Sequence, residues 1–337
     1  MKTLMMILGN GVTIDLINKL GLSEHIDTQN LFCKGDLVPW PDGNNEKGFL
    51  SYKHCRSLWN IGARPSMSKD EASNLIEDII SCANMIPSAS KLGSAPDNIY
   101  ISAYYELAAY LKHLFIYYNQ MVDDSMLKRL SDWGWYRLVS NAYNSSEYDK
   151  IVIITYNYDV FFERILKVWG IPFDISLIHE TGNKIKILKP HGSISFAHIN
   201  KAEKETYTIR KAQDMNEATI EDFSIHYDNM DDNYLISALI PPSGDSSRMT
   251  YKWAREIRDE IKQYAAALKP TDKLIISGLS YWHVDRKEID DILTSVNYEV
   301  DTYLVNPNPP RAFNAVLSCI FDKYIVYSNS KVLGGLI

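Results

Sequence analysis

The sequence has few cysteines, and none of them has a metal-binding spacing. Its 337 residues include Cys33, Cys55, Cys82 and Cys319, and no two of these form a C-x-x-C pair. A four-thiolate zinc site therefore has no support, and so few scattered cysteines do not indicate a disulfide framework. We expect a protein without zinc that works in a reducing, cytoplasmic environment.

The sequence also lacks an excess of positive charge. Its formal net charge is −7, whereas binding to nucleic acid through a broad face requires clustered lysine and arginine. Lys184, Lys186 and Lys189 come nearest to a cluster, and their spacing is typical of the solvated face of a strand. We therefore expect no direct nucleic-acid binding.

Long hydrophobic runs are missing as well. The apolar stretch that begins at Met1 is interrupted after about five residues by Gly-Asn-Gly, whereas a signal peptide has a longer apolar core. No stretch approaches the roughly 18 consecutive apolar residues of a membrane-spanning helix. We expect no association with a membrane.

Short apolar strands alternate with amphipathic helices over much of the chain. Residues 3–8 predict a buried strand that runs into a Gly-x-Gly turn and a helix, the order that opens a nucleotide-binding βα unit. Residues 51–147 predict helices without a convincing strand, and the alternation then resumes. This pattern predicts an α/β fold, with a Rossmann-like parallel sheet, helices on both faces and a helical insertion. We expect a Rossmann-like domain formed by 1–30 and 148–337, and a mainly helical insertion domain at 31–147.

The apolar periodicity also predicts the individual elements. Helices are expected at 12–22, 68–86 (with Ser68 as N-cap), 98–122, 125–143, 159–170, 249–269 and 284–296. Strands, with their flanking turns, are expected at 3–8, 150–157, 171–179, 184–193, 229–246, 272–280, 298–310 and 322–330, and a hairpin within 193–214.

Polar and small residues follow the ends of these predicted strands, where ligands bind in open α/β sheets. They are Gly9, Asn10, Gly11, Thr13, Thr155, Asn157, Asp159, His191, Gly192, Ser193, Ser243, Gly278, Ser280, Asp285 and Asn306. Several have an ordinary structural explanation, since Asp159 suits a helix N-cap and Asn306 a turn. Their occurrence at six strand ends nevertheless favours a binding site.

Three of these segments together resemble the sirtuin (Sir2) family. "TYNYD" at 155–159 resembles the T-x-N-x-D motif of that family, "KPHGS" at 189–193 its His-Gly motif, and "LGNGVT" at 8–13 its Gly-Ala-Gly turn. "GLS" at 278–280 and "VNPNP" at 305–309 are similar, in order, to the Gly-x-Ser and Asn segments that hold the adenosine half of NAD. The resemblance covers roughly the chain outside the helical insertion.

Two departures from the sirtuin deacylases narrow the resemblance. The chain has no cysteine between Cys82 and Cys319, so it lacks the zinc module with two C-x-x-C pairs, and it also lacks the Asp-Phe-Arg segment. The pattern is more similar to the SIR2-like, zinc-free domains of bacterial anti-phage defence systems. This resemblance implies an NAD+ glycohydrolase, which cleaves its substrate NAD+ to nicotinamide and ADP-ribose and so depletes NAD+ in abortive defence.

The chemistry of nicotinamide release gives each candidate residue a role. Cleavage passes through an oxocarbenium-like centre, and nicotinamide leaves as a neutral molecule. His191 suits a general base near neutral pH, and Asn157 can hold the ribose or the attacking water. Asp159 can orient the carboxamide or offset the developing positive charge. The remaining residues form the expected NAD+-binding set: Gly9, Asn10, Gly11, Thr13, Thr155, Gly278, Ser280 and Asn306.

Such an enzyme must be restrained until infection. We expect a homo-oligomer, or a separately encoded activator such as a HerA-like ATPase, because the chain has no P-loop motif of its own. The aromatic helix at 99–122 is expected to be core or subunit interface. Two other functions stay open, a non-catalytic module that binds NAD+ or ADP-ribose as a sensor or scaffold, and a zinc-free NAD-dependent deacylase.

Overall fold

The computed structural model describes most of the chain, and the described residues form two compact units. They are 1–42, 44, 46–88, 98–202, 207–209, 218–241, 251–281 and 286–337. The first unit comprises Met1–Ser23, Val122–Pro190 and Ala254–Ile337, and the second comprises Glu24–Met121 and His191–Trp253. Each unit is therefore assembled from segments that lie far apart in the sequence.

The first unit contains a seven-stranded parallel sheet, which confirms the predicted fold class. Its strand order is β10-β9-β8-β1-β2-β4-β3, and each neighbouring pair is parallel. The strands are β1 (Lys2–Leu8), β2 (Tyr148–Thr155), β3 (Phe173–Ile175), β4 (Ile185–Leu188), β8 (Lys273–Ser277), β9 (Asp301–Val305) and β10 (Tyr324–Tyr327). Central strand β1 is buried from Leu4 to Leu8. Its residues form a continuous apolar run because the strand is covered on both faces.

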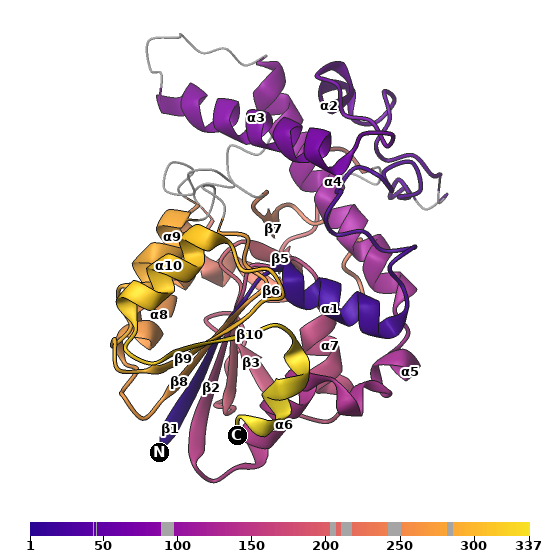
Figure 1. Ribbon diagram of the computed structural model, residues 1–337. Helices are drawn as coiled ribbons and strands as arrows, with labels where there is room; N and C mark the ends of the chain where they lie inside the picture. The colour runs from indigo at the N-terminus through magenta and orange to yellow at the C-terminus, as the bar shows by residue number, and fades with distance from the viewer. Residues whose placement is uncertain are drawn as a thin grey trace. The chain divides into compact units, whose positions relative to one another are not determined.

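Helices cover both faces of this Rossmann-like sheet (Figure 1). On one side lie α1 (Asn10–Leu20), α6 (Gly134–Asn144) and α7 (Phe161–Val168), and on the other α8 (Lys252–Ala266), α9 (Arg286–Leu293) and α10 (Arg311–Ile320). The chain crosses from β1 to β2 and from β8 to β9 in opposite directions. Right-handed crossovers therefore place the two sets of helices on opposite faces. The carboxyl ends of β1 and β8 form the switch point, where such sheets bind ligands.

The second unit combines helices with a small antiparallel sheet. Its elements are α2 (Arg56–Asn60), α3 (Lys69–Ser88), α4 (Ile99–Met121), β5 (Gly192–His198), η3 (Ile220–Asp222), β6 (Phe223–Ile225) and β7 (Ser237–Leu239). Strand β5 lies between β6 and β7. Tyr110 and Tyr118 of α4 are buried and donate their hydroxyl hydrogens to the main-chain carbonyls of Leu31 and Asp27. These aromatic residues are thus core residues of this unit.

The boundaries of the two units differ from the domain boundaries expected from the sequence, 1–30 and 148–337 against 31–147. Residues 122–147 fall in the first unit, because α6 packs on β2 and α5 (Asp124–Leu127) packs on α7. Residues 191–253 fall in the second unit, because β5 pairs with β6 and β7 rather than with the parallel sheet. Pairing between strands far apart in sequence leaves no mark on local periodicity.

Several predicted elements are present and others differ. Ser68 caps α3 in a capping box, since its hydroxyl accepts from the N–H of Glu71 and its own N–H donates to the Glu71 carboxylate. The single helix expected at 125–143 is instead α5, the short 3-10 helix η1 (Leu130–Asp132) and α6. Helices α2 and α10 and the C-terminal 3-10 helix η4 (Ser330–Gly335) were not expected. Part of the expected hairpin at 193–214 lies outside the described residues, and β5 pairs with β6 and β7 instead.

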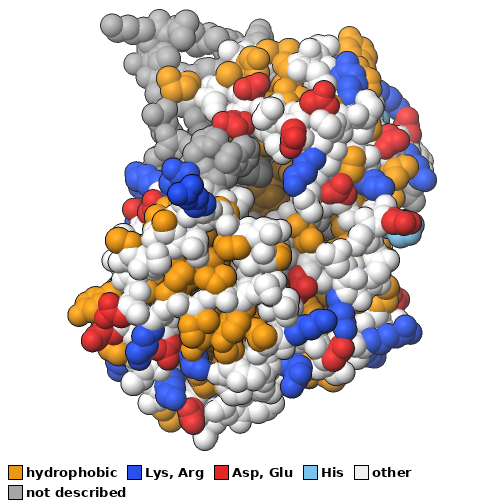
Figure 2. All heavy atoms as spheres, in the orientation of Figure 1, with side chains coloured by type: hydrophobic (Ala, Val, Ile, Leu, Met, Phe, Trp, Pro, Cys, Tyr) orange, Lys and Arg blue, Asp and Glu red, His pale blue; other side chains and the backbone are white. Residues whose placement is uncertain are grey.

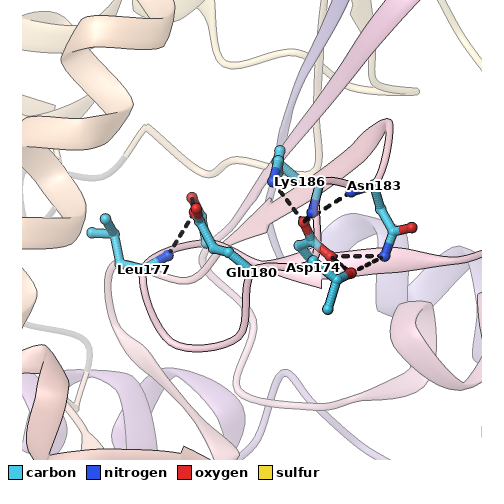
Figure 3. Close-up of polar contacts among 8 residues, drawn as sticks. Asp174, Leu177, Glu180, Asn183 and Lys186 are labelled. Carbon is cyan, nitrogen blue, oxygen red and sulfur yellow. Dashed lines mark hydrogen bonds and ion pairs between the residues drawn. The ribbon is translucent and has the colours of Figure 1, made fainter.

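The three lysines near β4 do not form a solvated face, so that prediction is wrong. The Lys186 side chain is 13% exposed and pairs at 2.6 Å with Asp174, which is 0% exposed. Figure 3 shows Asp174 also receiving hydrogen bonds from the loop that joins β3 to β4, including one from Asn183. Lys189 is 0% exposed and follows the end of β4, where the alternation of a strand no longer applies. Lys184 donates to three main-chain carbonyls at the end of α6.

Acidic and basic side chains lie interspersed on the face drawn in Figure 2, and neither sign forms a continuous patch there. Among the described residues, no helix is both long and apolar enough to span a bilayer.

Candidate functional site

Two glycine turns meet at the switch point of the parallel sheet. Gly9 and Gly11 follow β1, and Gly278 follows β8 with a φ of 70°. A Cβ at Gly11 would lie 2.5 Å from Cα of Gly278, and one at Gly278 would lie 2.6 Å from the backbone nitrogen of Gly11. This close backbone approach requires glycine on both sides. Three predicted NAD+-binding residues are thus brought together by the fold.

Helix α1 begins within the Gly9-Asn10-Gly11 segment, with Gly9 as its N-cap and Asn10 as its first residue. The N–H of Gly11 donates to the carbonyl of Gly278 at 3.2 Å, and the N–H of Val12 donates to the carbonyl of Gly9 at 3.1 Å. The helix N-terminus therefore faces the carboxyl edge of the sheet, where its positive dipole favours an anion.

Asn157, Thr13 and Asp159 form a directed series of hydrogen bonds. Nδ2 of Asn157 donates to the carbonyl of Gly9 at 3.1 Å and to Oγ1 of Thr13 at 2.9 Å. The Thr13 hydroxyl in turn donates to Oδ2 of Asp159 at 2.7 Å. An amide carries two N–H donors, and these two contacts use both of them. The group that Asn157 can offer to a ligand is therefore its side-chain carbonyl oxygen.

Asp159 is buried, with 5% of its surface exposed. Its second oxygen, Oδ1, accepts from the N–H of Phe161, the first residue of α7, at 3.2 Å. The N-cap of α7 is Val160, so Asp159 lies one residue before the N-cap position that the sequence suggests. Burial raises the pKa of this carboxyl, whereas the nearby Lys189 ammonium and the Thr13 hydrogen bond lower it. Asp159 is therefore not the N-cap of α7, and its catalytic role stays a prediction.

Lys189 and Glu163 form a buried ion pair next to Asp159, which was not predicted from the sequence. Nζ of Lys189 donates to the main-chain carbonyl of Asp159 at 2.5 Å and to Oε1 of Glu163 at 2.9 Å. The side chains of Lys189 and Glu163 are 0% and 1% exposed. A weak signal was available, because each charge has apolar neighbours in the sequence, in "ILKP" and "FFERIL".

A small cavity lies beside these residues within the first unit. Its volume is about 20 Å³, which is room for about one water molecule and too little for a dinucleotide. Asn157 and Asp159 give it a polar side, and Trp133 and Phe162 contribute aromatic walls. The other lining residues are Leu8, Val12, Thr13, Leu16, Thr155, Phe161 and Glu163.

His191 belongs to the second unit, where it directly precedes β5. Its side chain is 2% exposed, and its main-chain carbonyl accepts from the N–H of Ile240 at 3.0 Å. The next residue, Gly192, has a φ of 81°, and a Cβ there would lie 1.9 Å from the carbonyl oxygen of Ala238. Close backbone contact with β7 therefore fixes the position of His191 in this unit.

The remaining candidates lie at the same edge of the sheet or outside the described residues. Thr155 ends β2 and accepts from the N–H of Asn157 at 3.2 Å through its hydroxyl oxygen. Asn306 follows β9, and its side chain accepts from the N–H of Asn308 at 2.9 Å, which is turn chemistry. Ser280 is exposed, and Asn10 is the first residue of α1. Ser243 and Asp285 lie outside the described residues.

Within the described ranges, no group of three or more His, Cys, Asp or Glu side chains is arranged to hold a metal ion. A search with protein-family models finds no family that matches this chain, and a search of curated proteins finds no match either. The functional assignment therefore depends on the arrangement of the residues themselves.

Proposed function

We propose that this protein is a SIR2-like NAD+ glycohydrolase that cleaves NAD+ to nicotinamide and ADP-ribose. The observation that carries the proposal is the meeting of two glycine turns at the switch point, directly beside the Asn157–Thr13–Asp159 series. A switch point with glycine turns and a helix N-terminus suits the pyrophosphate of a dinucleotide. The three segments that resemble sirtuin motifs provide the residues of this arrangement and His191.

The contacts support separate roles for Asn157, Asp159 and His191. With its amide hydrogens engaged by Gly9 and Thr13, Asn157 presents its carbonyl oxygen, which can accept a hydrogen bond from water or a ribose hydroxyl. Asp159 lines the same cavity, and its negative charge would stabilise an oxocarbenium-like centre bound beside it. A cavity for about one water molecule beside these groups favours hydrolysis. In this proposal His191 accepts the proton of the attacking water.

The test is NAD+ turnover by the purified full chain, with nicotinamide release followed by chromatography. Wild type is expected to release nicotinamide, and His191→Ala is expected to lose activity by about 100-fold or more, the usual contribution of a general base. His179→Ala, which removes an exposed imidazole, is the matched control and should cleave at the wild-type rate. Equal activity of His191→Ala and wild type would contradict the assignment of the base.

The proposed activity requires restraint in the cell, since continuous cleavage would deplete NAD+. We propose control in the cytoplasm by a homo-oligomeric state or by a separately encoded activator, such as a HerA-like ATPase, in abortive anti-phage defence. Turnover should therefore be measured alone and with the product of the neighbouring gene. Size-exclusion chromatography that shows a monomer in both cases would contradict this form of control.

The hydrogen bonds of the site also favour a second candidate. Both carboxylate oxygens of Asp159 and both amide hydrogens of Asn157 are engaged within the protein, as in a rigid binding site. A module that binds NAD+ or ADP-ribose without turnover would use the same glycine turns. Calorimetry that shows binding of NAD+, with no nicotinamide released under any activating condition, would favour this alternative. Nicotinamide release that depends on an acetylated peptide would instead indicate a zinc-free deacylase.

A further inference from the structure

Lys189 holds the connection between β2 and α7 from the side opposite to α1. This connection, residues 156–160, carries Asn157 and Asp159. On one side, Thr13 of α1 contacts the side chains of both residues. On the other side, Nζ of Lys189 donates to the main-chain carbonyl of Asp159 at 2.5 Å. The connection is therefore fixed from both sides.

The same ammonium balances two buried carboxylates. Glu163 reaches Lys189 from α7 at 2.9 Å, and Asp159 lies on the connection that Lys189 holds. These are the charged groups that act on Asp159, whereas α1 contributes the uncharged hydroxyl of Thr13. All three side chains, Lys189, Glu163 and Asp159, are at most 5% exposed. Buried charges of one sign require such compensation, because water cannot screen them.

We propose that Lys189 is a positioning residue for the site, because it holds the 156–160 connection in place and keeps Asp159 ionised beside Glu163. It acts through Asp159 and does not contact substrate. The part of this inference that concerns activity rests on the proposed NAD+ cleavage. The part that concerns charge balance stands on the buried contacts alone.

Three variants separate the charge of Lys189 from its bulk. Lys189→Met keeps the length of the side chain and removes the ammonium, which leaves two buried carboxylates without a cation. Lys189→Met/Glu163→Gln removes both members of the ion pair, so that Asp159 loses its cation and its like-charged neighbour together. Lys186→Met is the matched control, because Lys186 also pairs with a buried carboxylate, Asp174, and contacts none of the site residues.

The first measurement is the free energy of unfolding against pH, which does not require any activity. In Lys189→Met, the buried carboxyls bind protons more tightly in the folded than in the unfolded state. Its stability deficit relative to wild type should therefore widen as pH rises from about 4 to 8. The double variant should reduce this widening. A deficit in Lys189→Met that stays constant over this range would overturn the inference.

The second measurement is the pH dependence of NAD+ cleavage. We expect the acid limb of kcat to move up by about 1–3 pH units in Lys189→Met, and to move back in the double variant. We expect KM to change less than kcat, and Lys186→Met to keep the wild-type profile. An unchanged acid limb in a folded Lys189→Met would overturn the role in positioning. If wild type cleaves no NAD+ under any condition, the proposed function fails, whereas the stability measurement still decides the charge balance.

Discussion

The hydroxyl group of Thr13 lies between Asn157 and Asp159, with Asn157 donating to it at 2.9 Å and Asp159 accepting from it at 2.7 Å. Thr13 comes from the helix after β1, and the other two residues come from the loop after β2. One side chain thus orients the amide and partly satisfies the buried carboxylate. The orientation of the Asn157 amide follows from its second contact, with the carbonyl of Gly9, because the opposite orientation would place two oxygens against each other.

The first prediction concerns the loss of this hydroxyl. Thr13→Val keeps the shape of the side chain but leaves Asp159 and Asn157 each without one partner. We expect a loss of about 1–3 kcal/mol in the free energy of unfolding, measured in urea, and at least a tenfold loss of NAD+ cleavage. Thr13→Ser should retain both properties.

Thr302→Val is the control for this variant. Thr302 is 1% exposed and donates to the carbonyl of Val300, away from the site residues. Loss of the Thr302 hydroxyl group should lower the free energy of unfolding and leave NAD+ cleavage unchanged. The same loss of activity in both variants would mean that the effect is structural only.

The second prediction concerns the contact between the glycine turns. Gly278→Ala adds a Cβ 2.6 Å from the backbone nitrogen of Gly11, at a φ of 70°. Gly170→Ala adds one at a φ of 66°, with no heavy atom within 4 Å. We expect Gly170→Ala to cost about 1–2 kcal/mol through the backbone conformation alone. Gly278→Ala should cost clearly more in the same urea titration, and equal costs would contradict the close approach.

The third prediction concerns pH and Asp174. Burial alone would raise the pKa of this carboxyl, but hydrogen bonds from Lys186, Thr181 and Asn183 hold it well below its usual 3.8. A lowered pKa stabilises the fold above pH 3.8, and this contribution is lost as pH falls through the folded-state value. Asp174→Asn should therefore cost about 3 kcal/mol at pH 7, and progressively less in strongly acidic solution. Urea titrations across this pH range measure the difference.

Asp124→Asn provides the comparison for Asp174→Asn. Asp124 pairs with Arg164 but is 61% exposed, so its loss should cost less than about 1 kcal/mol. A cost for Asp174→Asn as small as this would contradict the role of the buried pair.

The fourth prediction concerns a buried histidine of the second unit. His113 is 4% exposed and stacks on Phe49 at a ring distance of 5.2 Å. Burial, and then the charge of Lys112, lower its pKa well below 6.5. Because the unfolded chain binds the proton more tightly, stability should fall as pH drops below 6.5. His113→Phe should flatten this dependence, as measured by thermal unfolding between about pH 5 and 7. The exposed control His25→Gln should not flatten it.

The parallel sheet could be predicted from the sequence because its strands carry their signal locally. Residues 4–8 and 151–154 are continuous apolar runs, as burial on both faces demands, and both are fully buried in β1 and β2. The glycine turn and TYNYD were found for the same reason, since each directly follows such a run. Their contact through Thr13 follows from the fold class, because neighbouring parallel strands bring their carboxyl ends together.

The features that could not be predicted from the sequence depend on contacts with residues far away along the chain. The burial of Lys189 depends on Glu163, which lies on another element, so its charge alone suggested solvent. His191 follows a parallel strand in sequence, yet β7 pairs with the segment that begins there. Helix α10 lies at Arg311–Ile320, between two expected strands, in a stretch for which no element was expected.

The central position of β1 has a consequence for synthesis of the chain. Its two neighbours are β2 at 148–155 and β8 at 273–277, so neither is available when β1 leaves the ribosome. Parallel pairing over such sequence distances is slow, and an apolar strand with open edges is prone to aggregate meanwhile. We expect nascent chains to depend on chaperones that shield the KTLMMIL segment until β8 has emerged.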